Sequence, residues 1–106
     1  MPKYMYYGSY TQEGLDGFLK EGGTKRREAT KQLAESLGGS LLAYYYGFGK
    51  NDFYAIVDMP DQASGIAASL IANGSGAVNV TTVALITPEE ADEAIKLHGD
   101  YRPPGH

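Results

Sequence analysis

The chain contains no cysteine and no tryptophan, only two histidines, and no apolar run of the length that crosses a membrane. The absence of cysteine excludes a disulfide framework, a thiolate zinc site and a thiol nucleophile. Since His98 and His106 both lie near the C-terminus, we also expect no metal site, no haem and no other cofactor. The first residues lack the apolar segment of a signal peptide, so the sequence favours a cytoplasmic protein without a membrane partner.

Basic residues are also scarce, because nine lysines and arginines face 13 acidic residues and the formal net charge is -4. A nucleic-acid partner is not expected, since binding to the phosphate backbone needs a basic face. The sequence also lacks a phosphate-binding loop and a recognisable nucleophile with its base. A length of 106 residues predicts one domain over residues 1–106, and a chain this short gains stability from a partner subunit.

The first part of the chain predicts a strand followed by an interrupted helix. Residues 3–10 alternate as a strand does, and Thr11 is placed to cap the helix that follows. The pair Gly22-Gly23 interrupts this helix, because each glycine costs roughly 1 kcal/mol relative to alanine in a helix interior. We expect Thr24 to cap the second helical segment.

A hairpin and a further helix come next. Residues 41–47 and 53–58 form two strands joined by a turn of glycine, asparagine and aspartate, the residues that tolerate a tight reversal. The pair Pro60-Asp61 then opens a helix that Asn73-Gly74 closes. The expected buried stripe of this helix has i, i+3, i+4 spacing and consists of Ala63, Ile66, Ala67, Leu70 and Ile71.

The last strand is predicted over residues 78–86, and residues 87–90 form a capping box that begins a short helix to Leu97. The resulting order β-α-β-β-α-β predicts an α+β, ferredoxin-like fold with a four-stranded antiparallel sheet and a short C-terminal helix. That helix is too short and too thinly amphipathic to be stable alone, so we expect it to dock on the domain's own edge or on a second subunit.

Tyrosine is the abundant aromatic residue, with nine in the chain. Alternation places Tyr4, Tyr6 and Tyr10 on one face of the first strand, and Met5 and Tyr7 on the other. Because such strands are apolar or aromatic on both faces, we expect the chain to associate with itself, as a homodimer in which two sheets meet face to face or as a higher homo-oligomer.

Four residues are candidates for a site. Asp52 follows the hairpin turn, where its carboxylate would act as a base or bind a cation, or would only fasten the turn. Arg26 would clamp an anionic ligand, or would be part of a solvated charged helix face. Tyr10 and Tyr45 would offer hydroxyls to a ligand between helices and sheet, or would pack in the core.

Residues across nearly the whole chain resemble the GYD-domain family: Tyr4, Tyr10-Thr11, Gly14, Arg26, Gly38-Gly39, Tyr45, residues 49–52, Pro60-Asp61, Thr82 and residues 87–90. The resemblance implies a dimeric α/β barrel, in which two ferredoxin-like sheets face each other, and it implies no defined activity. The sequence departs from the family in its naming motif, because Asn51 stands where a tyrosine is expected between Gly49 and Asp52.

Two functions follow as hypotheses. The first is a dimeric module that binds a small organic molecule or serves in oligomerisation, with Tyr10, Arg26, Tyr45 and Asp52 as ligand-binding residues. The alternative is a cofactor-free enzyme of the oxygenase or isomerase type, with a tyrosine-lined cavity and Asp52 as catalytic base. The first is favoured, because no pair of titratable groups is arranged for acid and base duties.

Overall fold

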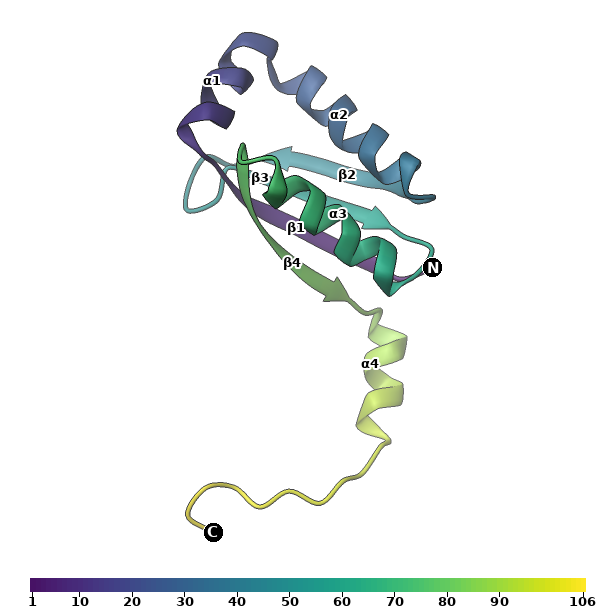
Figure 1. Cartoon of the computed structure of the whole chain (residues 1–106). Helices are drawn as coiled ribbons and strands as arrows, with labels where there is room; N and C mark the ends of the chain where they lie inside the picture. Colours follow the sequence, from purple (N-terminus) through teal and green to yellow (C-terminus); the bar gives the residue numbers. More distant parts are fainter.

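A four-stranded antiparallel sheet forms the body of the protein (Figure 1). The computed structural model describes residues 1–106. The strands are β1 (Lys3–Tyr10), β2 (Ser40–Tyr46), β3 (Phe53–Asp58) and β4 (Val78–Leu85), and their order across the sheet is β2-β3-β1-β4. This order, with helical crossovers after β1 and β3, confirms the α+β, ferredoxin-like prediction.

Four helices complete the chain: α1 (Gln12–Glu21), α2 (Gly23–Ser36), α3 (Gln62–Gly74) and α4 (Pro88–Ile95). The Thr11 hydroxyl accepts the backbone N–H of Gly14 and caps α1, and Thr87 forms the predicted capping box with Glu90. The predicted cap at Thr24 is wrong. Gly22 occupies the N-cap of α2 without a side-chain bond, because its φ of +85° lets the chain turn directly from α1 into α2.

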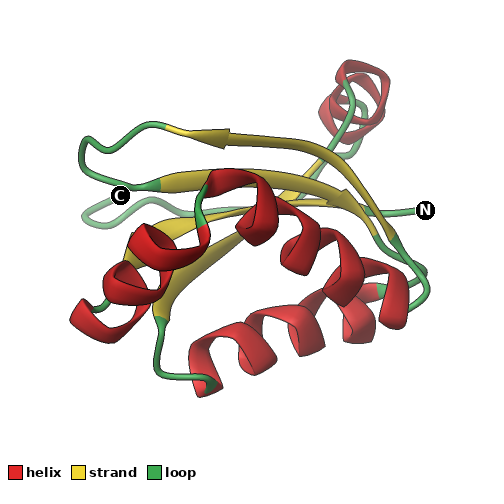
Figure 2. Cartoon of the chain, turned by 90° about the horizontal axis from the view of Figure 1, so that it is seen from above, coloured by secondary structure: helices red, strands yellow, loops and turns green.

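The helices α1, α2 and α3 all lie on one face of the sheet (Figure 2). Tyr4 and Tyr6 lie on one face of β1, as the alternation predicts; this face points toward the helices, and both residues are buried there. The rest of the core comes from β3, α2 and α3. Met59, directly after β3, is fully buried. The core residues are Tyr4, Tyr6, Ala34, Ala55, Val57, Met59 and Ala68.

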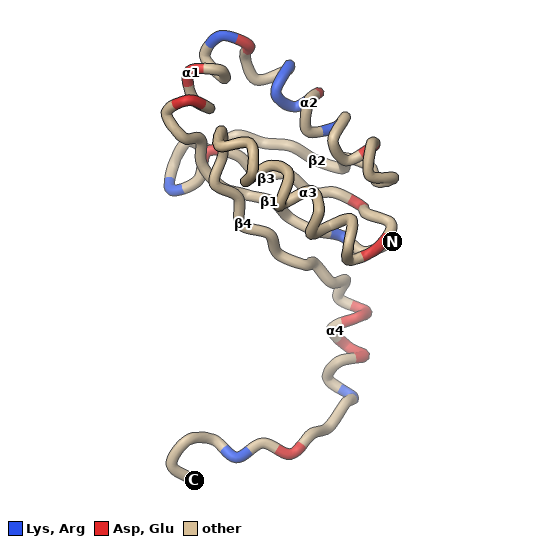
Figure 3. Tube along the Cα trace, in the orientation of Figure 1, with Lys and Arg blue, Asp and Glu red and all other residues tan.

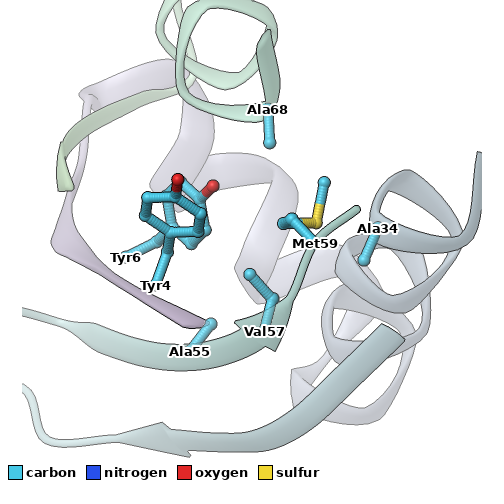
Figure 4. Close-up of a cluster of buried hydrophobic side chains, with 7 residues drawn as sticks. All are labelled: Tyr4, Tyr6, Ala34, Ala55, Val57, Met59 and Ala68. Atoms are coloured by element: carbon cyan, nitrogen blue, oxygen red, sulfur yellow. The ribbon is translucent and has the colours of Figure 1, made fainter. Parts of the chain in front are cut away.

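The inner face of α3 differs from the prediction. Its buried residues are Gly65 and Ala68, whereas Ile66 and Leu70 of the expected stripe are 47% and 67% exposed. The tyrosines of β1 cause this arrangement, because a Cβ at Gly65 would lie 2.5 Å from the Tyr4 ring and the Tyr6 hydroxyl donates to the Gly65 carbonyl. Figure 4 shows both rings rising from β1 toward α3, where Ala68 points to the sheet.

No helix packs against the other face of the sheet; α4, at the upper right of Figure 2, lies on that side without a buried residue. Alternation along β1 and β3 places Met5, Tyr7, Tyr54 and Ile56 on this open face, and all four are only partly buried. The rings of Tyr7 and Tyr54 stack with centroids 6.2 Å apart. One layer of helices therefore covers one sheet face, and an apolar face is left exposed.

The C-terminal arm, residues 86–106, leaves the body of the protein (Figure 1). Helix α4 has no buried residue, so it does not dock on the domain's own edge. That part of the expectation for the C-terminal helix is wrong. The radius of gyration is 16.7 Å, whereas a compact chain of this length has about 13 Å. The arm accounts for this elongation.

Candidate functional site

A cavity of about 210 Å³ lies between α2, α3 and the sheet. All four strands contribute to its wall, and 16 of its 19 lining residues are hydrophobic. The cavity exists because α3 presents Ala68 and Ala72 where larger side chains would fill the space. It is thus an apolar hollow inside the helix-covered half of the protein.

The polar groups of the cavity come mainly from β1, β2 and α2, as Tyr10, Tyr44 and Arg26. The Tyr10 hydroxyl is buried and has no hydrogen-bond partner. The hydroxyls of Tyr44 and Tyr46 are near enough to influence its pKa, yet neither meets it in hydrogen-bonding geometry. A buried hydroxyl without a partner costs about 1–3 kcal/mol, a cost that a hydrogen bond to another group would offset.

Burial raises the pKa of the phenols of Tyr10 and Tyr44. It raises the pKa of Tyr10 to about 12, with a smaller contribution from the Tyr46 hydroxyl, and the Arg26 guanidinium opposes the shift. Burial, followed by the Tyr46 hydroxyl, also raises the pKa of Tyr44 well above its usual value. Both side chains are therefore neutral hydrogen-bond donors near pH 7.

Aromatic packing fixes the orientation of Tyr10. Its ring lies 5.3 Å, between centroids, from both Phe18 of α1 and Phe53 of β3. Phe18 in turn contacts Tyr46, whose hydroxyl donates to the Gly23 carbonyl at 3.0 Å. Held by these neighbours, the Tyr10 hydroxyl keeps its position at low entropic cost when a ligand binds.

Arg26 supplies the positive charge of the cavity. Its guanidinium Nη1 is 3.6 Å from Glu21 Oε1 at the end of α1, a long contact between partly exposed groups. Such a pair contributes little to stability, so the guanidinium stays available to a ligand anion.

The structure brings two of the four predicted site residues together and separates the others. Tyr10 and Arg26 line the cavity, whereas Tyr45 is 70% exposed and lies on the opposite face of the sheet. Asp52 is also outside the cavity lining. Its carboxylate accepts the backbone N–H of Tyr10 at 3.0 Å, and its own N–H donates to the Gly8 carbonyl at 2.7 Å. Asp52 therefore fastens the hairpin turn to β1, which is the structural alternative for this residue.

Sequence reasoning missed Tyr44. A β-bulge between Leu41 and Ala43 reverses the alternation of β2, so Tyr44, opposite the buried Ala55, faces the helices and Tyr45 faces away. Regular alternation from Leu41, which packs against the core, would have put Tyr45 inside. A tyrosine run flanked by small and aliphatic residues gives no local signal for the bulge.

The structure shows neither a cluster of metal-binding side chains nor a membrane-spanning helix. Nowhere do three or more histidine, aspartate or glutamate side chains converge as metal ligands do. None of the helices combines the length and the apolarity that crossing a membrane requires. Asn51, at the position of the family tyrosine, lies in the hairpin turn, where its carbonyl accepts the Gly49 N–H.

Comparison with known proteins gives one match. The sequence profile of the family described as GYD domain matches residues 4–95, which include all four helices and the whole sheet except Lys3. No curated protein and no solved structure matches the chain. The chain belongs to the GYD-domain family.

Proposed function

We propose that the protein is a dimeric module that binds a small, mostly apolar molecule with one acidic oxygen in the cavity between α2, α3 and the sheet. The observation that carries this proposal is the buried Tyr10 hydroxyl, which has no partner in the protein. In this mostly apolar cavity a ligand oxygen would satisfy the Tyr10 donor and recover its desolvation cost.

The size of the cavity supports a ligand of about one ring. An engineered apolar cavity of about 150 Å³ holds benzene, and the volume here is about 210 Å³. A single ring with one small substituent therefore fits. The substituent would meet Tyr10, Tyr44 and Arg26, and the positive charge of Arg26 favours a carboxylate over a neutral or cationic group.

Three probes of similar size and different charge test this function. Benzoate, toluene and benzylamine would each be added to the purified protein, and the melting temperature would be measured by differential scanning calorimetry. We expect benzoate to stabilise the protein, toluene to stabilise it less and benzylamine to have no effect. A ligand at 100 times its dissociation constant adds about 2.7 kcal/mol to the free energy of unfolding.

A pair of neighbouring arginines provides the matched control. Arg26→Gln should abolish the preference for benzoate over toluene, whereas Arg27→Gln should leave it unchanged, because Arg27 does not line the cavity. Equal stabilisation by benzoate and benzylamine, or no stabilisation by any of the three probes, would contradict the proposal.

The cofactor-free enzyme remains the alternative function, and it has less support. It required Asp52 as a base within reach of a substrate, and this carboxylate is bound to the Tyr10 backbone outside the cavity. The cavity offers neutral phenols and a guanidinium, which bind and orient but do not abstract a proton near pH 7.

The homodimer is supported by the open face of the sheet. Exposed apolar faces of this kind mark association surfaces, and pairing two copies would cover Met5, Tyr7, Tyr54 and Ile56 at once. Size-exclusion chromatography with light scattering should give a mass of twice 11.4 kDa at micromolar concentration. A monomer under these conditions would refute the dimer.

A further inference from the structure

The C-terminal arm carries apolar side chains that nothing in its own chain covers. Ile95 and Leu97 are 76% and 80% exposed, and Tyr101 is equally open. An isolated helix of eight residues is not stable in water, even with a capping box. The helical conformation of α4 therefore depends on a surface against which the arm packs.

A suitable surface lies at the far edge of the sheet. An open groove, here called the edge groove, runs between α2 and β2 and is lined by Arg27, Lys31, Leu42 and Tyr45 among others. The bulge in β2 turns Leu42 outward, where it is 49% exposed. β2 is also an edge strand, so its outer backbone groups have no partner strand, and a helix laid along such an edge protects it.

The arm and the edge groove are complementary in polarity. Their charges are complementary chiefly at Lys31, because Arg27 is already paired at 3.4 Å with Glu28, which also lines the groove. Ala91, Ala94 and Ile95 share one face of α4 by their i, i+3, i+4 spacing, which matches the exposed Leu42 and Tyr45. Glu90 and Asp92 flank this apolar face, within a helix whose charges up to residue 95 are all acidic. Figure 3 shows acidic residues along α4, and on α2 basic residues with acidic residues among them.

The arm cannot reach the edge groove of its own chain. β4 and β2 are opposite edges of the sheet, separated by three inter-strand spacings, about 14 Å. Only residues 86 and 87 lie between the end of β4 and the start of α4, and two residues span at most about 7 Å. The α4 that fills the groove must therefore come from a second copy.

We infer that two copies of this chain exchange their C-terminal arms, so that α4 of each copy lies in the edge groove of the other. The apolar face of α4 covers Leu42 and Tyr45, and its carboxylates face Lys31, next to the Arg27–Glu28 pair. This inference rests on the proposed homodimer and adds to it a second, reciprocal contact at the β2 edge of the sheet. It does not depend on ligand binding.

Cysteine cross-linking tests the exchange, because the chain has no native cysteine. A tagged Leu42→Cys chain and an untagged Ile95→Cys chain would be mixed, refolded together and oxidised. Each carries one cysteine, so any disulfide between the two must join different copies. We expect the tagged-untagged pair as the main covalent product. Leu70→Cys, on the outer face of α3 and 67% exposed, replaces Leu42→Cys in the control and should give little of that product.

A charge exchange provides a second test. Lys31→Glu should raise the dissociation constant of the dimer roughly tenfold, because it removes an attraction and adds a repulsion against the acidic arm. Asp92→Lys in the same chain should restore it, while a purely structural effect of the first substitution would persist. Lys31 and Asp92 are both exposed, so neither substitution should unfold the monomer. Circular dichroism would verify that each variant is folded.

The outcomes separate the two proposals. A dimer by light scattering without selective cross-linking to Leu42→Cys, or without recovery in the Lys31→Glu/Asp92→Lys chain, overturns the arm exchange and leaves the face-to-face dimer. A monomer without cross-links overturns both. Selective cross-linking together with charge rescue supports the exchange.

Discussion

The buried hydroxyl of Tyr10 leads to an unusual expectation, that its removal stabilises the ligand-free protein. In Tyr10→Phe the ring keeps its contacts with Phe18 and Phe53, and only an oxygen without a partner is lost. Because such an oxygen costs about 1–3 kcal/mol, we expect the free energy of unfolding to rise by about 1 kcal/mol. For a chain of this length that is an increase of roughly 4–8 °C in melting temperature.

Tyr6→Phe is the matched control, since Tyr6 is also a buried tyrosine of β1. Its hydroxyl donates to the Gly65 carbonyl, so its loss leaves an acceptor unpaired and should lower the free energy of unfolding by about 1–2 kcal/mol. The two substitutions remove the same atom from the same strand and should shift the melting temperature in opposite directions.

Calorimetric melting without ligand measures both effects, and repeating it with benzoate completes the experiment. Tyr10→Phe should reduce the stabilisation by benzoate, because about 1.4 kcal/mol of lost hydrogen bonding weakens binding tenfold. A lower melting temperature for ligand-free Tyr10→Phe would refute the reasoning, since it would mean that the hydroxyl already has a partner in solution.

Three further predictions concern the surroundings of the site. Asp52→Ala should lower the free energy of unfolding, measured by urea denaturation, by about 1–2 kcal/mol. Asp52→Asn keeps an acceptor for the Tyr10 N–H and should lower it less. Equal losses would contradict the role of Asp52 in fastening the hairpin turn to β1. Gly65→Ala should destabilise the protein by about 1–3 kcal/mol, because the added methyl group would clash with Tyr4. Gly17→Ala, with open space around it, should stabilise the protein by about 0.5–1 kcal/mol. Equal melting temperatures for the two variants would argue against the close packing of α3. Tyr6 and Tyr10 have a pKa of about 12 when folded and about 10 when unfolded, so the folded state holds more protons between these values. The contribution of these two groups to stability should therefore be constant below pH 10 and be lost as pH rises toward 12. Melting temperatures measured across this range check the sign, and a rise with pH would disprove the burial of these phenols.

Local signals in the sequence were sufficient for the elements. The hairpin turn, the capping box at Thr87 and the glycine break at Gly22 each depend on residues within a few positions, and the structure has all three. The strand order followed from the sequence of elements, since a β-α-β-β-α-β chain has few ways to form one antiparallel sheet.

The sequence predictions were wrong where residues far apart in the chain determine the local structure. The inner face of α3 is set by tyrosines some 60 positions earlier, which need Gly65 beneath them, and periodicity within the helix instead favoured its larger side chains. The bulge at Leu42 places Tyr44, and not the predicted Tyr45, on the helix side of the sheet, because one extra residue reverses the faces of a strand. Arg26 and Tyr10 were identified from residue type alone, and their meeting in one cavity depends on how α2 crosses the sheet.

The small inner face of α3 gives the two helices of the cavity separate tasks in ligand choice. Ala68 and Ala72 form the helical wall opposite tyrosines that packing holds in place, so exchanging either alanine for valine or leucine would shorten the cavity without moving the sheet. The charge of the cavity comes from Arg26 on α2, which such a change leaves intact. Size selectivity and charge selectivity thus reside on different helices, and single substitutions can alter one while the other is retained.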